Sequence, residues 1–450
     1  MAPLASLAVR FDVIRRFKLV VKMAQLAKEA SILMGSLTSE VKNNALAAIA
    51  QALMANQDAI IVANEKDLAR ARQDKVSDVL LKRLRFDKGK IASAAAAIES
   101  LIKLDDPVGK TLDATELDKG LELYKVSCPI GVLGIVFESR PDALVQISTL
   151  ALKSGNAVLL KGGTEAANTN KILAEIIAGA SARAGLPDGW MALLETRADV
   201  KAMLELDDYI DLIIPRGSSA FVKYIMDNTS IPVLGHADGI CHVYVDAGAD
   251  VDMALKIAYD SKCQYAAVCN AMETLLVAEK IAGDFLPRIK ALYDKAGVQI
   301  RGDQRCREII DCVAASEQDW CTEYNELIIS IKVLAGLDNA IEHINRFGSH
   351  HTDAIVTEDE RAAKRFMNLV DSANVFWNCS TRFADGYRYG LGAEVGISTN
   401  KIHARGPVGL EGLVIYKWKL LGSGQVVADY SGDNGRSFTH KKIAGNNTLS

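Results

Sequence analysis

The feature that most constrains the fold is an uninterrupted apolar run, Ile-Gly-Val-Leu-Gly-Ile-Val-Phe, at residues 130–137. A strand that is apolar throughout is typical of a parallel sheet covered on both faces, because a half-exposed strand alternates apolar and polar residues. Shorter apolar segments follow, separated by stretches with helical spacing. The expected strands lie at 157–160, 212–214 and 242–245, and the expected helices at about 166–184, 218–227 and 251–261. This alternation predicts an α/β fold with a mostly parallel sheet.

The alternation of strands and helices repeats more loosely after residue 270. The second set of expected strands lies at 275–277, 327–333, 354–356 and 375–377, with a helix at about 280–296. Because 450 residues exceed one ordinary domain, we predict a second α/β lobe. The first third of the chain is interpreted as helical and includes one helix from about Val76 to Lys103.

Two further segments, at residues 121–126 and 413–418, alternate apolar and polar residues. Alternation is typical of strands with one exposed face. We expect these two strands to pair with each other outside both lobes, as an arm whose strand edges a partner subunit would cover. The expected assembly is therefore a homo-oligomer.

Composition argues against several classes of function. A net charge of −4 without a basic stripe gives no reason to expect nucleic-acid binding, and no uncharged apolar stretch is long enough to cross a bilayer. The eight cysteines form no Cys-x-x-Cys pair, which argues against structural zinc and fits a reducing cytoplasm. The cluster of His343, His350, His351 and Asp353 fits no zinc motif and is interpreted as a loop, so we predict no bound metal.

The first 22 residues are basic, with Arg10, Arg15, Arg16 and Lys18 against Asp12. They lack the apolar core and the cleavage site of a secretory signal. The regular pattern begins only after them. We therefore interpret this segment as an extension or a misassigned start, with an amphipathic transit peptide as the alternative.

Cys269 is the foremost candidate for chemistry. It lies between a helix-like stretch and a β-like run at 274–278, with Asn270 beside it. A thiolate is a strong nucleophile that forms a thioester at an acyl carbon. The alternative is a small buried hydrophobe, which is what most unpaired cysteines are.

Three strand-to-helix turns offer groups that suit an anion. The residues of interest in these turns are Ser139, Arg140, Lys161, Gly217 and Ser218. Ligands of open parallel sheets bind outside the carboxyl ends of strands, and glycine at a helix start lets the backbone approach a phosphate. The alternatives are turns shaped by geometry alone and a surface ion pair between Arg140 and Asp142.

Four separate runs, taken in order, closely resemble the γ-glutamyl phosphate reductase family of the aldehyde dehydrogenase superfamily. They lie at residues 139–142, 264–274, 348–356 and 401–412. The resemblance extends from about residue 23 to about residue 428. It implies a cofactor lobe, a catalytic lobe and an oligomerisation arm. It also implies NADPH-dependent reduction of L-glutamyl 5-phosphate to L-glutamate 5-semialdehyde, the second step of proline biosynthesis from glutamate.

The resemblance assigns roles to residues of this chain. It makes Cys269 the nucleophile that carries the acyl group, with Asn270 and Ser139 assisting catalysis. The substrate anions are expected at Arg140, Lys262, Arg405 and His403. The cofactor is expected at Lys161, Gly217, Ser218 and Glu323.

The family position of the water-activating glutamate of hydrolysing aldehyde dehydrogenases is taken here by His236. The absence of that glutamate implies a thioester that reacts with hydride or phosphate and is not lost to water. A hydrolysing NAD(P)-dependent aldehyde dehydrogenase acting on another small aldehyde is the alternative, followed by a non-catalytic protein that retains the fold. The resemblance also leaves open a transient contact with glutamate 5-kinase, which makes the acyl phosphate.

The expected domain boundaries follow from these patterns. They are an extension at 1–22, an NADPH-binding domain at 23–256 interrupted by arm strands at about 111–128, a catalytic domain at 257–395, a segment at 396–430 that returns to the arm, and a tail at 431–450.

Overall fold

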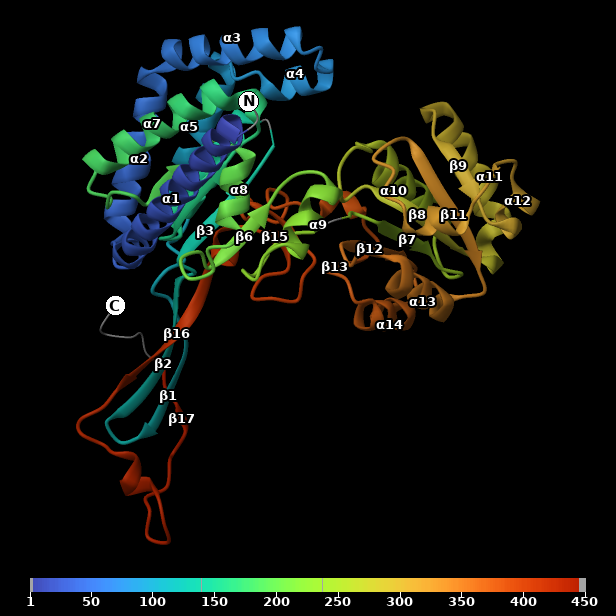
Figure 1. Cartoon of the computed structure of the whole chain (residues 1–450). Helices are drawn as coiled ribbons and strands as arrows, with labels where there is room; N and C mark the ends of the chain where they lie inside the picture. The colour runs from blue at the N-terminus through green and yellow to red at the C-terminus, as the bar shows by residue number, and fades with distance from the viewer. Residues whose placement is uncertain (1–2, 139, 237, 445–450) are drawn as a thin grey trace. The chain divides into compact units, whose positions relative to one another are not determined.

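The computed structural model describes residues 3–138, 140–236 and 238–444, without the side chains of residues 3–13 and 79. These residues form two compact units (Figure 1), which confirms the two expected α/β lobes. As far as they are described, the first unit comprises Met1–Gly217, Tyr224–Val233 and Gly409–Ser450, and the second comprises Ser218–Lys223 and Leu234–Val408.

The first unit is built on a four-stranded parallel sheet in the order β5-β4-β3-β6. Its strands are β3 (Val132–Val136), β4 (Ala157–Lys161), β5 (Met191–Leu193) and β6 (Leu212–Pro215). Every residue of β3, β4 and β6 is buried, as the apolar runs predict. Its helices are α1 (Pro3–Met34), α2 (Ser39–Ala55), α3 (Gln57–Gln73), α4 (Asp78–Leu84), α5 (Lys88–Ile102), α6 (Pro141–Lys153), the 3₁₀ turn η1 (Thr164–Ala166), α7 (Ala167–Arg183) and α8 (Arg197–Met203), while α9 (Ser219–Asp227) has residues in both units.

The single helix expected from Val76 to Lys103 is wrong, because the structure has two helices, α4 and α5. Asp87 has an extended backbone and caps α5 by accepting a hydrogen bond from the Lys90 N–H at 3.0 Å. Phe86 beside it is fully buried, and its N–H donates to Asn64 Oδ1 at 2.8 Å. A tertiary contact therefore sets the break, and helical periodicity alone does not reveal it.

No structural boundary separates residue 22 from the rest of the chain, since α1 runs from Pro3 to Met34. Val20 is buried, and Arg16 Nη1 lies 3.5 Å from Asp199 Oδ1 on α8. The described part of the expected extension is therefore helical and packs on the first unit.

The second unit contains a seven-stranded sheet in the order β10-β9-β11-β8-β7-β12-β13, with every neighbouring pair parallel. Its strands are β7 (Cys241–Val245), β8 (Met272–Ala278), β9 (Gln299–Gly302), β10 (Val313–Ala314), β11 (Ile328–Leu334), β12 (Thr352–Val356) and β13 (Asn374–Trp377), beside a two-stranded sheet of β14 (Gly396–Ser398) and β15 (Gly406–Val408). Its helices are α10 (Val251–Cys263), α11 (Glu279–Ala296), α12 (Gln304–Ile309), α13 (Leu337–Phe347) and α14 (Glu360–Leu369), with the 3₁₀ turns η2 (Glu317–Cys321) and η3 (Thr381–Phe383).

Helices cover both faces of this larger sheet (Figure 1). Phe285 and Ile289 of α11 belong to a buried apolar cluster on one face, together with α10. Ile344 of α13 and Phe366 of α14 belong to a second cluster on the other face. The sheet is therefore buried on both sides, and its strands are apolar for that reason.

The expected domain division after residue 256 differs from the structure, which divides the chain after Val233. The reason is the pairing of β7, whose Val243 lies opposite Leu275 of β8 and Ala354 of β12. The strand and the helix that follows it thus belong to the second unit. The placement of the cofactor in the first unit and of catalysis in the second stays a prediction.

The expected arm is present as a four-stranded antiparallel sheet in the order β16-β2-β1-β17. Its strands are β1 (Thr111–Asp118), β2 (Leu121–Pro129), β16 (Val414–Leu421) and β17 (Lys441–Lys442), with the 3₁₀ turns η4 (Leu410–Leu413) and η5 (Val427–Tyr430) nearby in the chain. The pairing of β16 with β2 is confirmed. The segment expected at 396–430 is divided, because residues up to Val408 belong to the second unit.

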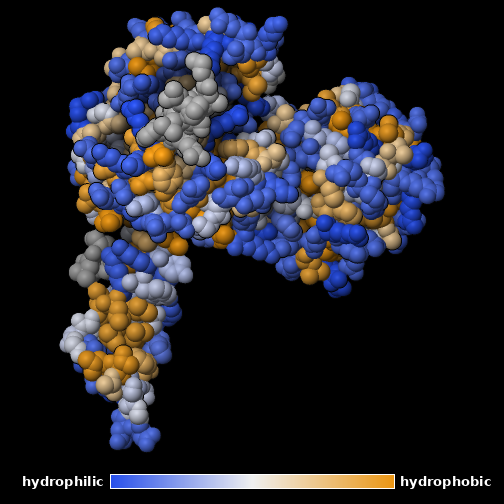
Figure 2. Space-filling model, viewed as in Figure 1, coloured by the Kyte–Doolittle hydropathy of each residue, from blue (hydrophilic) through white to orange (hydrophobic). Residues whose placement is uncertain are grey.

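Apolar side chains gather on the arm (Figure 2). Tyr416, Trp418 and Leu420 of β16 are all exposed.

Among the described helices, none is long and apolar enough by itself to cross a membrane. The bent pair of α2 and α3 meets the length and composition criteria jointly, which buried core helices also do.

Candidate active site

Cys269 lies in the loop between α10 and β8, the junction that the sequence predicts. Cys241 holds this loop in place, because its Sγ donates a hydrogen bond to the Cys269 carbonyl oxygen at 3.2 Å. Gly239 packs against the same residue so closely that a Cβ atom there would lie 2.2 Å from the Cys269 carbonyl oxygen. Glycine at position 239 therefore permits the close approach of the two loops.

Two imidazoles converge on the Cys269 sulfur. One donor atom each of His236, Cys269 and His351 lie within 4.8 Å of one another. The two rings meet edge to face, with centroids 4.9 Å apart. His236 Nδ1 lies 2.9 Å from the Ile397 carbonyl oxygen, and because a carbonyl only accepts, Nδ1 carries a proton.

Burial raises the pKa of the Cys269 thiol to about 12. The carboxylates of Glu323 and Glu394 raise it further, while the backbone N–H of Cys269 and the Arg382 guanidinium oppose the rise. Burial likewise lowers the pKa of His351 well below its ordinary value of 6.5, so this ring is neutral. The resting thiol is therefore protonated, and a nucleophilic thiolate requires transfer of its proton to a nearby base.

We expect Glu323→Gln to speed alkylation of Cys269 by iodoacetamide about three- to tenfold at constant pH. Removing one negative charge near the sulfur lowers the thiol pKa and increases the thiolate fraction. Since that pKa is about 12, the wild-type rate should rise about tenfold per pH unit between pH 7 and pH 10. The measurement is the modified fraction of the Cys269 peptide by mass spectrometry. Glu326→Gln, at an exposed carboxylate nearby, serves as the control, and equal rates for the two variants would contradict the expectation.

Asn270 follows Cys269 in the chain, and the Glu323 carboxylate acts on the Cys269 thiol. Asn270 is buried, its Nδ2 donates to the Ala384 carbonyl oxygen at 2.8 Å, and its Oδ1 has no partner among the described residues. Burial raises the pKa of the Glu323 carboxyl, with a smaller opposing effect from the Gly239 N–H. Their catalytic and cofactor roles stay predictions.

Lys262 is not available to a substrate anion, which corrects the expectation for this residue. Its side chain is fully buried, and its Nζ lies 2.5 Å from Glu273 Oε2, also fully buried. The Asn325 N–H donates to the other Glu273 oxygen at 3.2 Å. Burial lowers the pKa of Lys262 and raises that of Glu273 to about 7. The pair links α10 to β8 on either side of Cys269.

Comparisons with known proteins identify the family. The sequence pattern of the aldehyde dehydrogenase family matches residues 16–307. The chain is 62% identical over 422 residues to the γ-glutamyl phosphate reductase of Pelotomaculum thermopropionicum. The aligned residues cover 94% of this chain and 97% of the relative. The chain belongs to the γ-glutamyl phosphate reductases.

A second relative and a solved structure agree with this assignment. The γ-glutamyl phosphate reductase of Methanococcoides burtonii is 54% identical over 428 residues, and the match covers 93% of this chain and 95% of the relative. The crystal structure of the Thermotoga maritima γ-glutamyl phosphate reductase superposes with a TM-score of 0.89 at 41% identity. The match covers 90% of this chain and 99% of the Thermotoga maritima chain. The aldehyde-dehydrogenase-like fold is thereby confirmed.

Arg405, expected to bind substrate in a γ-glutamyl phosphate reductase, already has partners within the protein. Its Nη1 lies 3.1 Å from Asp371 Oδ1, its Nη2 donates to the Asp371 carbonyl oxygen, and its Nε donates to the Thr399 carbonyl oxygen. Lys401 and Arg405 together lower the pKa of Asp371. A substrate anion would have to compete with these partners. His403 is exposed on the same loop.

The γ-glutamyl phosphate reductase residues expected in the first unit have mixed environments. Arg140 Nη2 pairs with Asp142 Oδ2 at 2.7 Å and is half exposed, which is the alternative interpretation of this turn, whereas Ser139 lies outside the described residues. Lys161 ends β4, is buried, and donates from Nζ to the Gly162 carbonyl oxygen at 2.5 Å. Burial lowers the pKa of Lys161.

Gly217 and Ser218 form the exposed turn between β6 and α9, as expected. The Ser218 carbonyl oxygen accepts from the Phe221 and Val222 N–H groups and so begins the helix. Because β3, β4 and β6 are parallel, Lys161 and Gly217 lie at the same, carboxyl-terminal edge of their sheet. That edge is where open α/β sheets bind nucleotides, and a lysine with a glycine turn fits a dinucleotide phosphate.

Sequence reasoning did not assign His351 or Arg382 to the site. His351 lies in one of the runs that carry the family resemblance, so that run contained a usable signal. Arg382 lies outside all of them. It is buried, donates from Nε to Gln264 Oε1 at 3.0 Å, and places its positive charge near Cys269.

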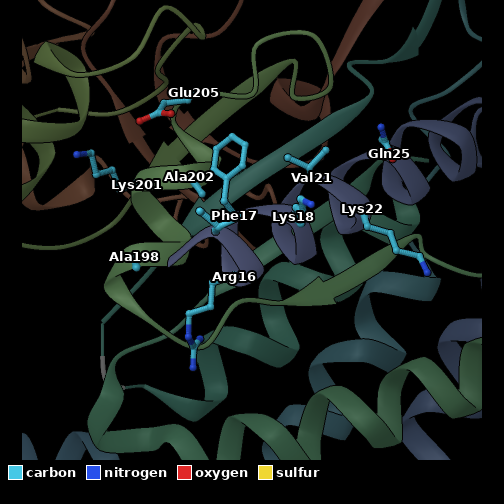
Figure 3. A pocket seen from close by; sticks show the side chains of 11 residues that line it. Arg16, Phe17, Lys18, Val21, Lys22, Gln25, Ala198, Lys201, Ala202 and Glu205 are labelled. Carbon is cyan, nitrogen blue, oxygen red and sulfur yellow. The ribbon is translucent and has the colours of Figure 1, made fainter. Parts of the chain in front are cut away.

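A separate cavity of about 780 Å³ lies between α1 and α8 in the first unit (Figure 3). It is lined by Ile14, Arg16, Phe17, Lys18, Val21, Lys22, Gln25, Ala198, Lys201, Ala202 and Glu205. None of the residues expected in the active site lines it.

Proposed function

We propose that this γ-glutamyl phosphate reductase uses Cys269 and NADPH to reduce L-glutamyl 5-phosphate to L-glutamate 5-semialdehyde and phosphate. The reaction is the second step of proline biosynthesis from glutamate, and we assign it to the cytoplasm. The observation that carries the proposal is a thiol flanked by two imidazoles at the helix–strand junction of a chain similar to this family over nearly its whole length.

The first step is attack of the Cys269 sulfur on the γ-carbonyl carbon. His236 Nε2 is the base that accepts the thiol proton, because its Nδ1–H is fixed on the Ile397 carbonyl oxygen. His351 is a poorer base, since burial lowers its pKa well below 6.5. Phosphate then leaves and a γ-glutamyl thioester remains on Cys269.

The developing oxyanion needs hydrogen-bond donors at the acyl carbon. The backbone N–H of Cys269 opposes the rise in the pKa of its own thiol, so it faces the sulfur and is suitably placed. The free N–H of the Asn270 amide is the second candidate donor, and Ser139 the third. Arg382 supplies positive charge for the substrate phosphate or α-carboxylate, a role that we also assign to Arg140, Arg405 and His403.

NADPH, when bound, supplies the hydride that reduces the thioester. The residues that would hold it are Lys161, Gly217, Ser218 and Glu323. Lys161 and Gly217 suit the phosphates, because they lie at the carboxyl edge of the first sheet. Glu323 suits the nicotinamide ribose, because its carboxylate acts on the Cys269 thiol, where hydride must arrive.

The hydrolytic alternative is not favoured. A hydrolysing enzyme needs a base that activates water at the thioester, and position 236 carries histidine where that glutamate is expected. The Nδ1 of His236 is also held by the Ile397 carbonyl oxygen at 2.9 Å. We further propose a homo-oligomer assembled through the arm, whose β16 exposes apolar side chains, while the contact with glutamate 5-kinase stays a prediction.

The reverse reaction tests the proposed function. With L-glutamate 5-semialdehyde and NADP⁺, NADPH formation is expected to require inorganic phosphate and to rise with its concentration until saturation. The thioester can leave Cys269 only by attack of phosphate if water is not activated. Sulfate at equal ionic strength is the control. Equal NADPH formation without phosphate would instead identify a hydrolysing aldehyde dehydrogenase.

A further inference from the structure

Two thiols that have no part in the proposed reaction meet at the edge of the seven-stranded sheet. Cys306 lies on α12, and Cys312 comes immediately before β10, the outermost strand. Both sulfurs lie over Gly302 of β9, where a Cβ atom would be 2.6 Å from Cys312 Sγ and 2.8 Å from Cys306 Sγ. The separation of the two sulfurs therefore cannot exceed the sum of these short distances. We propose that Cys306 and Cys312 form a reversible disulfide when a low-molecular-weight disulfide oxidises them.

The two thiols also act on each other. Burial raises the pKa of Cys306 above its ordinary value, and the Cys312 thiol raises it further. Burial also raises the pKa of Cys312, but a hydrogen bond with Cys306 opposes that rise, as do the Gly302 N–H and the Arg307 guanidinium. These directions are those of a Cys306 S–H that donates to the Cys312 sulfur. The pair thus differs from a buried cysteine that serves only as a small hydrophobe.

The backbone on both sides of the pair is held in place. The Cys306 N–H donates to Asp303 Oδ1 at 2.9 Å, and the Cys306 carbonyl oxygen accepts from the Ile310 N–H at 2.9 Å. Beyond Cys312, the Ala315 N–H donates to the Gly302 carbonyl oxygen at 2.9 Å. We therefore expect a bond of about 2.05 Å to form by rotation of the two side chains, with this backbone kept in place.

Cys312 is the thiol that reacts first, because it is half-buried whereas Cys306 is fully buried. With oxidised glutathione, the Cys312 thiolate attacks one sulfur and releases one glutathione, leaving a mixed disulfide. The Cys306 thiolate then attacks the Cys312 sulfur and releases the second glutathione. Each released thiolate takes up the proton that the attacking thiol has lost. Two protein thiols and one glutathione disulfide thus become one protein disulfide and two glutathione thiols.

The disulfide ties α12 to the outermost strand of the sheet. β10 has two residues and pairs with β9 alone among the described strands. When a short edge strand detaches, the backbone of its neighbour becomes available for pairing with another chain. The bond therefore protects this edge of the sheet under oxidising conditions.

Peptide mapping of the full chain after incubation with oxidised glutathione tests the proposal. Trypsin cleaves after Arg307, between the two cysteines, so the disulfide appears as two linked peptides that a reductant separates. We expect these linked peptides in the wild type and in the control Cys321→Ser, which removes the other cysteine of the same tryptic peptide. Cys306→Ser should instead retain glutathione on Cys312. No linked peptides in the wild type, or linked peptides that persist in Cys312→Ser, would overturn the proposal.

Gly302→Ala tests the geometry while keeping both thiols. The added methyl group occupies the place where the sulfurs meet, so the disulfide should form at least about tenfold more slowly. Gly283→Ala is the matched control, because a Cβ atom at that position meets no described atom within 4 Å. Equal rates for the two variants would contradict the assigned geometry.

Hydrogen exchange measures the restraint on the edge strand. The Ala315 amide should exchange about tenfold more slowly in the oxidised wild type than in the reduced protein, because opening of this edge then requires α12 to move as well. Cys306→Ser, treated in the same way, should show no such slowing. Equal exchange of Ala315 in oxidised and reduced wild type would refute the protection of the sheet edge.

Discussion

Turnover is expected to fall at least about a thousandfold in Cys269→Ser, while affinity for NADPH stays within about twofold of the wild type. A serine hydroxyl has nearly the same size as the thiol but a much higher pKa, so His236 cannot generate an effective nucleophile from it. The residues expected to hold NADPH do not include the sulfur. The measurements are the phosphate-dependent reverse rate and NADPH fluorescence on binding.

Cys263→Ser is the matched control for this variant. Cys263 is the last residue of α10, partly buried, and burial raises the pKa of its thiol to about 11. It therefore resembles Cys269 in environment but lacks the two imidazoles. Full activity is expected for it. A Cys269→Ser protein that keeps a tenth or more of the wild-type rate would refute the nucleophile assignment.

Breaking the buried pair of Lys262 and Glu273 is expected to cost about 3–5 kcal/mol in the free energy of unfolding. In Lys262→Met the Glu273 carboxylate is left buried without its cation, and in Glu273→Gln the ammonium is left without its anion. Both side chains are fully buried, so water cannot compensate either charge. The double variant Lys262→Met/Glu273→Leu should recover most of this loss, because neither charge remains.

Urea unfolding monitored by circular dichroism and tryptophan fluorescence measures these differences. The exposed pair of Lys364 and Glu360 on α14 provides the control, since Lys364→Met should cost less than about 1 kcal/mol. Single variants of the buried pair that cost no more than this control would show that the charges are solvated in solution.

The strand–helix alternation and the arm were predictable because each depends on a local pattern. A strand apolar throughout must be buried on both faces, and β3, β4 and β7 are. The pairing of β16 with β2 was also predictable, because two half-exposed strands outside the lobes needed a partner.

Contacts between particular side chains or strands from different parts of the chain were not predictable from such patterns. Lys262 lies on a helix just before a run with family resemblance, and nothing in its spacing shows that Glu273 on the next strand neutralises it. Likewise, β7 could belong to either sheet until its register with β8 was known. Cys269 was correctly placed at a helix–strand junction, but the convergence of His236 and His351 on it joins loops far apart in the sequence.

The two edges of the arm sheet differ greatly in length. One edge is the eight-residue β16, whereas the other is β17, with two residues. If two copies join β16 to β16 in antiparallel fashion, each uses its only long edge among the described strands. Little backbone is then left to template a third copy. Such growth is self-terminating: the ribbon can extend into one continuous sheet across a two-fold axis, but it cannot propagate into a fibre.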